Sequence, residues 1–481
     1  MQFRDASRLL SVSVLGLGSL VSTNAVFAAG FALRNHSASG VGTSLASDTV
    51  NTNDASGLLS NPAIMSTFKG ANVSLNINYT DANIKASNAT LTTLGGTAHP
   101  VQGGSSEDNV SDGITIPSLY GIYQVTDEVH VGLSFNVPYG TNTKYADTWT
   151  GRYHGTKTEL TAYDVGLHGS YKINNMVAMG VTLDWQQAEG ELGSAVDLAT
   201  GTLLATLQGI EAQRQAGTIT DAQAAGAATN ARNTHGPAVG NADIISTYKG
   251  DSTAIGWGIG FLVKPNETSR IGLSYKGAVK HEAKGDIKFA TTTATSAGYL
   301  AGARATAQGA RFNDNNDAKL TIDLPAVISL GYAQDVADFT VYANATQTMW
   351  STLSELSPEW AGQRSVTKLE WKDSLYLAVG GDYRLAPEWT LRAGVGLDRS
   401  VTDKDHRTPR TPDGDRTAAS LGASYKVGAF DLSLAYQQLF LKDTESDLQA
   451  NAYADNAVRG TLKAKYEISP SIAVVSAGYA F

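Results

Sequence analysis

Alternation of apolar and polar residues is the feature that most constrains the fold of this chain. Residues 270–280 read RIGLSYKGAVK, with Ile271, Leu273, Tyr275 and Val279 on one face. The same period of two recurs at 389–397, 421–427 and 430–436. This period is typical of β-strands. The opposite face carries mainly Gly, Ser, Ala and Thr instead of the many charges of a soluble sheet, which favours the crowded lumen of a barrel.

The lengths of the connections favour a membrane barrel over a soluble sandwich. We expect strands that start near residues 71, 114, 129, 158, 176, 251, 269, 319, 338, 367, 388, 415, 429 and 458. Tight turns alternate with long polar connections, near 87–113, 141–157, 191–250, 291–318, 351–366, 400–414 and 441–457. Outer-membrane barrels have short periplasmic turns, long outer loops and an even strand number. The sequence therefore predicts an all-β fold, a fourteen-stranded antiparallel transmembrane β-barrel over residues 71–481.

Residues 1–28 have the pattern of a secretory signal peptide. Arg4 and Arg8 precede an apolar run over 9–20, and Val26 and Ala28 are small residues before a cleavage site. We expect the mature chain to start near Ala29. A membrane anchor is the alternative, although the run is shorter than the ~20 apolar residues of a transmembrane helix.

Composition and motifs argue against several function classes. The 481 residues include no cysteine, which rules out disulfides, cysteine zinc sites and thiol catalysis. The 45 acidic residues outnumber the 36 basic ones, so a nucleic-acid partner is not expected. The sequence has no serine-hydrolase elbow, P-loop or zinc-protease motif, so we expect no enzyme, no catalytic residues, no cofactor and no metal. A lipase that uses His154 or His168 is the enzymatic alternative.

Residues 29–70 precede the first predicted strand and do not alternate. They are rich in Gly, Ala, Ser, Asn and Thr, and the pair Asn61-Pro62 predicts a turn. A segment of this length and composition fits a small N-terminal hatch, that is, a plug inside the lumen. A flexible periplasmic tail is the alternative.

The carboxy-terminal end is a further strand. Residues 475–481 alternate and end on Phe481, with Tyr479 two residues before it. This ending resembles the terminal signal by which outer-membrane barrels are recognised for insertion. Pro470 cannot donate to a strand ladder, so we expect it at the outer end of this strand or at a bulge.

Several short motifs, in order along the chain, resemble the long-chain fatty acid transporter (FadL) family of outer-membrane channels. They are Ala29-Gly30-Phe31, Ser37 to Gly40, Asn61-Pro62-Ala63, Pro138-Tyr139-Gly140, Leu324-Pro325, Trp350-Ser351, Trp371-Lys372-Asp373 and Pro412 to Arg416. The resemblance implies a monomeric fourteen-stranded barrel that is plugged by its amino terminus and takes up hydrophobic molecules.

Two outer loops are candidates for ligand capture. Within 191–250, the residues Leu203, Leu204, Leu207 and Ile210 have the spacing of one apolar helical face. The loop 291–318 could supply a second partner. The resemblance places a first, low-affinity site in a groove between these two loops. A solvated helical flap without ligand is the alternative.

The resemblance also implies a gate and an exit. Pro138, Tyr139 and Gly140 interrupt a strand pattern near the place where family members open a lateral window in the wall. Ala29, Gly30 and Phe31 would be displaced by ligand, while Asn61, Pro62 and Ala63 would hold the hatch against the lower barrel. An ordinary strand end and an ordinary turn are the alternatives for Pro138 and for Asn61-Pro62-Ala63.

The charges expected for a carboxylate ligand are only partly present. The family's fatty acid channels have an Arg late in the fifth strand and a Lys in the tenth; Lys372 matches the Lys, but Gln187 stands in place of the Arg. Burying a carboxylate without a partner is costly, so the missing Arg weakens the case for a carboxylate ligand. It strengthens the case for a neutral aromatic or aliphatic hydrocarbon. Lys372 could instead pair with Asp373 or Glu370.

We therefore predict an outer-membrane channel for passive uptake of long-chain fatty acids or related hydrophobic compounds. Its expected surroundings are lipopolysaccharide and outer-membrane lipid. A general porin and an adhesin are the alternatives from other classes.

Overall fold

The computed structural model describes residues 29–93, 99–101, 103–306, 309–314, 316–452 and 456–481. The predicted signal peptide, residues 1–28, lies outside the described residues. Among the described residues, no helix is long and apolar enough to cross a membrane.

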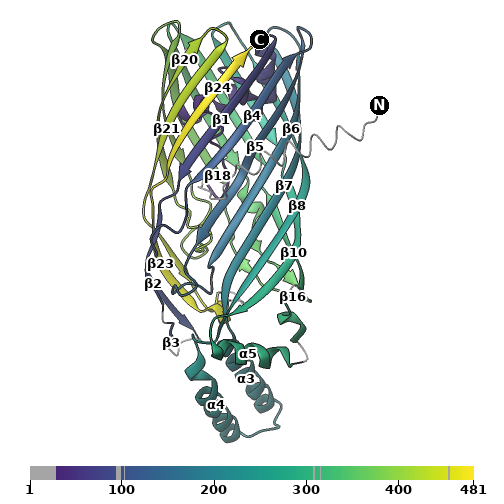
Figure 1. Cartoon of the computed structure of the whole chain (residues 1–481), viewed down its shortest axis with the longest axis vertical. Helices are drawn as coiled ribbons and strands as arrows, with labels where there is room; N and C mark the ends of the chain where they lie inside the picture. Colours follow the sequence, from purple (N-terminus) through teal and green to yellow (C-terminus); the bar gives the residue numbers. More distant parts are fainter. Residues whose placement is uncertain (1–28, 94–98, 102, 307–308, 315, 453–455) are drawn as a thin grey trace, which may run out of the picture.

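The main sheet closes on itself, because the first strand pairs with the last. All neighbouring strands are antiparallel, and β1 pairs on one side with β4 and on the other with β24. The wall is a barrel of fourteen strands, as predicted (Figure 1). Its strands are β1 Ala71–Asp81, β4 Ile114–Gln124, β5 Val129–Lys144, β6 Lys157–Lys172, β7 Val177–Asp197, β8 Asp243–Val263, β9 Ser269–Lys276, β12 Val327–Val336, β13 Phe339–Thr348, β18 Ser374–Arg384, β19 Trp389–Asp398, β20 Arg416–Val427, β21 Phe430–Leu441 and β24 Ser471–Ala480.

Two wall strands continue outward after a break at the same height. β9 is followed by β10 (Val279–Thr291), and β11 (Asn316–Leu324) precedes β12. β10 pairs with β11, and β9 pairs with β12. The second break contains Pro325, which lacks the N–H that a ladder needs.

The alternation in the sequence corresponds to the two faces of this wall. Large apolar side chains such as Leu183, Ile255 and Leu421 face outward and are exposed. Aromatic pairs lie on the outside at the end with the short turns, where the ring of Trp389 contacts that of Tyr425 and the ring of Phe430 contacts that of Tyr479. An outward apolar band with aromatic girdles is the surface that a lipid bilayer requires.

The outer side of the barrel contains more strand than expected. β2 (Ile84–Thr93), β3 (His99–Pro100), β22 (Thr444–Leu448) and β23 (Thr461–Ile468) form a second sheet beyond the membrane wall. The expected loops near 87–113 and 441–457 are therefore partly strands. Their Ser, Thr and Asn residues hide the alternation, because these strands do not face lipid. Pro470 lies in the short gap between β23 and β24.

Helices and short hairpins complete the outer end (Figure 1). The long connections fold into α3 (Leu198–Gln215), α4 (Asp221–His235), η4 (Gly236–Ala238), α5 (Ala294–Arg304), η5 (Gly309–Phe312), η6 (Trp350–Thr352), β14 (Glu355–Leu356), β15 (Glu359–Trp360), β16 (Gln363–Arg364), β17 (Thr367–Lys368) and α6 (Asn456–Arg459).

The segment 29–70 lies inside the lumen and touches the wall on all sides. α2 (Ala38–Gly42) contacts β19, β20, β21 and β24, whereas η3 (Pro62–Thr67) contacts β5, β6, β7 and β8. η1 (Asp48–Val50) contacts β9 and β12, and η2 (Ala55–Leu59) contacts β1 and β4. Hydrogen bonds between polar side chains join this segment to the wall. For example, Ser44 Oγ lies 2.7 Å from Ser420 Oγ of β20. Small inward residues are needed because the backbone of this segment lies directly on the wall: a Cβ at Gly394 would be 2.1 Å from the carbonyl oxygen of Thr43.

Candidate ligand vestibule and gate

Four aromatic side chains from distant parts of the sequence meet at the start of the segment 29–70. The Phe31 ring centroid is 4.8 Å from that of Trp350, 5.6 Å from that of Trp371 and 6.1 Å from that of Tyr139. Phe31, Trp350 and Trp371 are buried. Four of the short motifs found in the sequence therefore form one aromatic cluster that holds the amino-terminal segment.

Gly30 has a backbone conformation that this cluster requires. Its φ is +68°, and a Cβ at this position would be 2.8 Å from the Trp350 ring. Only glycine combines a left-handed conformation with such a close approach at low cost.

The start of the segment is also held by a buried carboxylate. Asp398 Oδ2, at the outer end of β19, accepts hydrogen bonds from the Ala29 backbone nitrogen at 3.1 Å and from Arg34 Nη2 at 2.9 Å. Asp398 and Ala29 are both buried. The first described residues are thus tied to the wall by a charged contact as well as by apolar packing.

β5 bends where the sequence predicted an interruption. Asn136 pairs with Asp164 and Tyr139 with Ala162, so Val137 and Pro138 together lie opposite one residue of β6. This is a one-residue β-bulge.

The neighbouring strand does not follow the bend. β4 pairs with β5 only between Leu119↔Phe135 and Gln124↔His130. Beyond this point the hatch takes the place of β4: Leu33 N donates to Pro138 O at 2.8 Å, and Gly140 N donates to Phe31 O at 2.9 Å. The amino-terminal segment therefore covers an interruption in the pairing of the wall.

Asn61, Pro62 and Ala63 lie against the part of the wall that is close to the short turns. Asn61 Nδ2 donates to Phe261 O of β8 and to Thr49 O, both at 3.0 Å. A Cβ at Gly260 would overlap the Asn61 side chain, and one at Gly180 would overlap Pro62. Two wall glycines thus make room for this turn.

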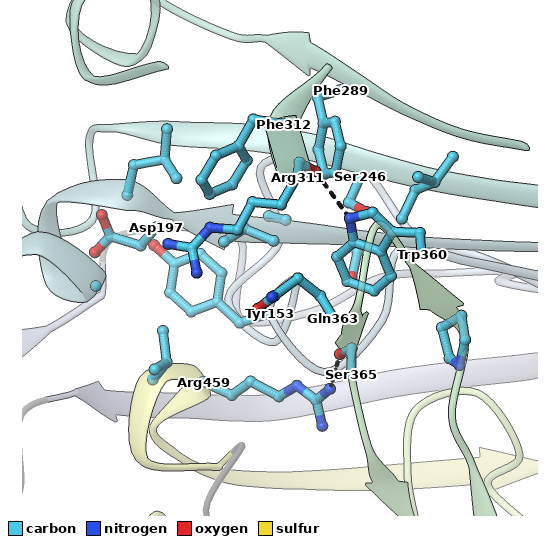
Figure 2. Close-up of a pocket in the computed structure, with 18 of the residues that line it drawn as sticks. Tyr153, Asp197, Ser246, Phe289, Arg311, Phe312, Trp360, Gln363, Ser365 and Arg459 are labelled. Carbon is cyan, nitrogen blue, oxygen red and sulfur yellow. Dashed lines mark hydrogen bonds between the residues drawn. The ribbon is translucent and has the colours of Figure 1, made fainter. Parts of the chain in front are cut away.

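The outer loops enclose a vestibule of about 780 Å³ (Figure 2). Its apolar walls include Ile287 and Phe289 of β10, Phe312, Leu356 and Trp360. Trp360 Nε1 donates to Arg311 O at 2.8 Å, and Arg459 Nη2 donates to Ser365 Oγ at 2.9 Å (Figure 2). A cavity of this size that is mainly apolar with a few polar groups is typical of small-molecule sites.

The two predicted capture loops both reach this vestibule, but with other residues than expected. α3 lines it with Leu198, Gly201, Thr202, Ala205 and Thr206, and the loop after α5 contributes Thr306. Leu203 is buried, whereas Leu204, Leu207 and Ile210 are half-buried, and none of the four lines the cavity. The structure therefore does not bring these four side chains to the vestibule, and a ligand contact elsewhere on α3, along which α4 packs, stays a prediction.

Gln187 is not a lumenal residue. Side chains at odd positions of β7 face outward in this region, and Gln187 Nε2 donates to Glu189 on the outer surface. The inward residue is Gln186, whose Nε2 donates to Asp164 Oδ2 at 2.8 Å. A shift of one residue in a strand moves a side chain to the other face.

Lys372 does not reach the vestibule either. Its Nζ pairs with Asp403 Oδ2 at 2.8 Å, and the Lys372 side chain is 66% exposed. Partial burial opposes the charge on Asp403, but hydrogen bonds from Lys372 and His406 outweigh it and lower the pKa of Asp403 to about 2. Neither of the partners expected from the sequence, Asp373 and Glu370, forms this ion pair.

The histidines of the enzymatic alternative are placed in structural hydrogen bonds. His154 Nε2 lies 3.0 Å from Gly460 O in the outer loops, and burial lowers the pKa of His154 to about 3. His168 Nε2 lies 2.9 Å from Ser134 Oγ, but its Nδ1 faces Thr182 Oγ1 and not a carboxylate. Within the described part of the chain, no group of three or more His, Asp or Glu side chains could hold a metal ion.

Three charged residues that line the vestibule, Arg410, Arg459 and Asp197, could not be predicted from the sequence. Arg410 lies in a loop, Arg459 ends the short helix α6 and Asp197 ends β7, and none belongs to a periodic pattern. Only the motif 412–416, which starts two residues after Arg410, pointed to this region.

A closed barrel with long outer loops, a filled lumen and an apolar vestibule defines the class of outer-membrane β-barrel transport proteins. The family model "Outer membrane protein transport protein (OMPP1/FadL/TodX)" matches residues 18–481, and the chain belongs to this family and to the bacterial outer membrane.

Relatives cover most of the chain. Outer membrane protein P1 of Haemophilus influenzae is 29% identical over 445 residues, which are 88% of this chain and 89% of that protein. The long-chain fatty acid transport protein of Escherichia coli K12 is 26% identical over 443 residues, 87% of this chain and 89% of that one.

Solved structures share the fold. A Pseudomonas aeruginosa FadL homologue has a TM-score of 0.80 at 23% identity and covers 94% of this chain and 99% of its own. The Ralstonia pickettii toluene transporter TbuX has a TM-score of 0.60 at 15% identity, with 92% of this chain and 98% of its own covered.

Proposed function

We propose that this protein is a channel for passive uptake of hydrophobic compounds across the outer membrane. The compound is captured in the vestibule between the outer loops, passes to the aromatic cluster, displaces residues 29–34 and leaves sideways through the wall between β4 and β5.

One observation carries this proposal. The strand pairing of the wall stops between β4 and β5, and the amino-terminal segment supplies the missing partner at Pro138 and Gly140. Moving this segment would uncover β5 without unfolding a wall strand. The path then ends in the hydrocarbon of the bilayer, where an apolar compound is more stable than in water.

The packing of the segment at the periplasmic side of the lumen supports an exit through the wall. The turn at Asn61 stays bonded to β8 through Phe261 O, so the lower part of the hatch blocks a straight passage to the periplasm.

The compound is a long-chain fatty acid or a related lipophile, and an aromatic or aliphatic hydrocarbon is the second candidate. One relative is named a long-chain fatty acid transport protein, and one structural neighbour is a toluene transporter. The vestibule has room for either.

Labelled uptake tests the proposal. A strain that lacks the protein is complemented with the chain and given radiolabelled oleate or toluene at low concentration. We expect uptake of at least one compound to rise several-fold over the empty-vector control. Uptake of neither compound, with the barrel present in the outer membrane, would contradict the proposal.

Two further experiments distinguish the proposed channel from a general porin and from an adhesin. A general porin would give large single-channel currents in planar bilayers, whereas the plugged barrel should give small ones. An adhesin would keep its activity without residues 29–34, whereas the channel should lose control of uptake.

We also propose that the channel is a monomer in contact with lipopolysaccharide. Outward charges lie side by side above the apolar band, where Glu189, Asp251, Lys284 and Lys319 are neighbours across β7, β8, β10 and β11. These charges suit phosphorylated sugars and their counterions. Mass spectrometry of the purified barrel should find one chain with bound lipopolysaccharide, and replacing Lys284 and Lys319 with Gln should reduce the bound amount.

A further inference from the structure

The vestibule carries more positive than negative charge. Among the described residues, four arginines line it, Arg311, Arg364, Arg410 and Arg459, and Asp197 is the acidic residue in the lining. An apolar cavity with this balance favours an anionic occupant over a neutral one, because a buried cation is stabilised by a nearby anion.

Asp197 does not compensate these arginines. Its Oδ1 caps α3 by accepting from the backbone nitrogens of Ala199 and Thr200, at 3.0 and 3.3 Å. Its Oδ2 accepts from Thr200 Oγ1 and from Gly240 N at 2.5 and 2.9 Å. Arg364, in contrast, is paired with Glu355 and Glu359 outside the cavity.

The hydrogen-bond acceptors of Arg410 among the described residues are all neutral. Its Nη1 donates to Lys157 O at 2.7 Å and to Thr158 Oγ1 at 3.1 Å, and its Nη2 donates to Gly193 O at 2.9 Å. These bonds use three of the five N–H donors of a guanidinium. Arg410 is 7% exposed, and no carboxylate of the described residues lies within salt-bridge distance of it.

A second guanidinium increases the local positive charge. Arg459 also lines the cavity, where it donates to Ser365 Oγ and Val366 O, both at 2.9 Å. Burial, and then the charge of Arg459, lower the pKa of Arg410 to about 9. The guanidinium is therefore still protonated at neutral pH, but in a position that would be stabilised by an anion.

Arg410 is held in place by a loop that crosses the mouth of the barrel. The connection between β19 and β20 reaches β5 and its outer continuation, where Tyr145 Oη donates to Pro409 O at 2.9 Å. The Arg410 side chain then bonds to β6 and β7 at Lys157 and Gly193. A cation fixed from both ends is suited to bind one head group in a defined orientation.

We propose that Arg410, with Arg459 beside it, binds the carboxylate of a long-chain amphiphile while the apolar wall of the vestibule holds its tail. This inference rests on the proposed function and narrows it: the captured compound is anionic, and a neutral hydrocarbon is disfavoured at this site. The positive charge for the head group thus comes from an outer loop and not from a strand of the wall.

The experiment compares oleate with oleyl alcohol, which has the same tail and no charge. Half-saturating concentrations for uptake are measured in the deletion strain with the wild-type channel and with Arg410→Met, Arg410→Lys and Arg399→Met. Arg399→Met is the matched control, because Arg399 lies in the same connection as Arg410, pairs with Asp415 at 3.0 Å and does not line the vestibule. Outer-membrane amount and heat-dependent gel mobility report whether each barrel is folded.

We expect Arg410→Met to raise the half-saturating concentration for oleate about tenfold or more and to leave that for oleyl alcohol unchanged. Arg410→Lys should recover much of the loss, and Arg399→Met should have little effect. Equal loss for both compounds in folded Arg410→Met, or no loss for either, would overturn the assignment. Wild-type uptake of neither compound would instead contradict the proposed function itself.

Discussion

The conformation of single residues decides how tightly the amino-terminal segment fits. Gly30 and Gly217 have nearly the same φ, +68° and +69°, but a Cβ at Gly30 would meet Trp350 whereas one at Gly217 would meet nothing within 4 Å. We expect Gly30→Ala to destabilise the packed segment by about 1–3 kcal/mol more than Gly217→Ala, because only Gly30→Ala adds overpacking to the left-handed strain.

Protease cleavage of the segment measures this difference. Faster cleavage near residues 29–34 in Gly30→Ala than in Gly217→Ala is the expected result. Equal cleavage rates would show that the aromatic cluster does not hold the segment.

The neighbours Gln186 and Gln187 offer a second comparison at this scale. Gln186 is buried and bonds to Asp164, whereas Gln187 lies on the outer surface. Gln186→Leu should lower the free energy of unfolding by about 1–3 kcal/mol, because Asp164 then loses a buried donor. Gln187→Leu should change it by less than about 0.5 kcal/mol. Denaturant unfolding of the reconstituted barrel distinguishes the two, and similar effects of both changes would contradict the assigned faces.

Residue types could be predicted from the sequence better than residue positions. The motifs around Phe31, Tyr139, Trp350 and Trp371 identified side chains that do meet. Gln187 was placed on the wrong face because an alignment by motif does not fix the parity of a strand. Arg410 could not be found, since its partners at Lys157 and Gly193 are more than 200 positions away in the chain.

At the scale of the element, the bulge of β5 is the part of the wall that the proposed exit needs. Deleting Pro138 removes the extra residue and brings β5 back into one register with β6. The straightened strand could then pair with β4 along its outer half. We expect labelled uptake to fall at least tenfold while the barrel stays folded.

Pro138→Ala is the control for this deletion. It keeps the number of residues and thus the bulge, so uptake should stay near the wild-type level. Unchanged uptake after the deletion would place the exit elsewhere.

The outer loops should loosen in acid because of His154. Its folded pKa is about 3, below the unfolded value of 6.5, so only the unfolded loop takes up a proton between these values. Stability is therefore fully present above pH 6.5 and is lost as the pH falls toward 3.

Hydrogen–deuterium exchange over residues 456–460, corrected for intrinsic rates, tests this at pH 7 and pH 5. Exchange should increase at pH 5 in the wild type and much less in His154→Gln, which cannot gain a proton. An equal increase in both proteins would assign the effect to other groups.

The helix α3 shows what periodicity can and cannot predict. An apolar spacing over 203–210 correctly predicts a helix. It does not show what the apolar face packs against, and here α4 lies along α3 while other residues of α3 line the vestibule.

At the scale of the whole molecule, the barrel could be predicted because its signals are local. Alternation is read within one strand and loop length between two strands, so neither depends on distant contacts. The vestibule and the contacts of residues 29–34 combine residues that are far apart in the chain, such as Ala29 with Asp398. Their geometry follows from closure of the barrel and could not be read from any single segment.

The central claim is that residues 29–34 must move for a compound to pass, and a reversible cross-link can test it. Ala32 and Tyr139 form an antiparallel bridge, flanked by hydrogen bonds from Leu33 N and Gly140 N, a geometry with closely spaced Cα atoms that suits a disulfide. The chain has no cysteine, so a double Ala32→Cys/Tyr139→Cys variant has no competing thiols. Ser44→Cys/Ser420→Cys, at hydroxyls 2.7 Å apart, cross-links the body of the hatch and is the control.

Oleate uptake by the oxidised Ala32→Cys/Tyr139→Cys channel is the most direct measurement. The predicted result is loss of uptake on oxidation and recovery on reduction, with uptake through the Ser44→Cys/Ser420→Cys channel unaffected by either treatment. Uptake at the same rate in the oxidised and reduced states of the first variant would show that the segment does not gate the channel.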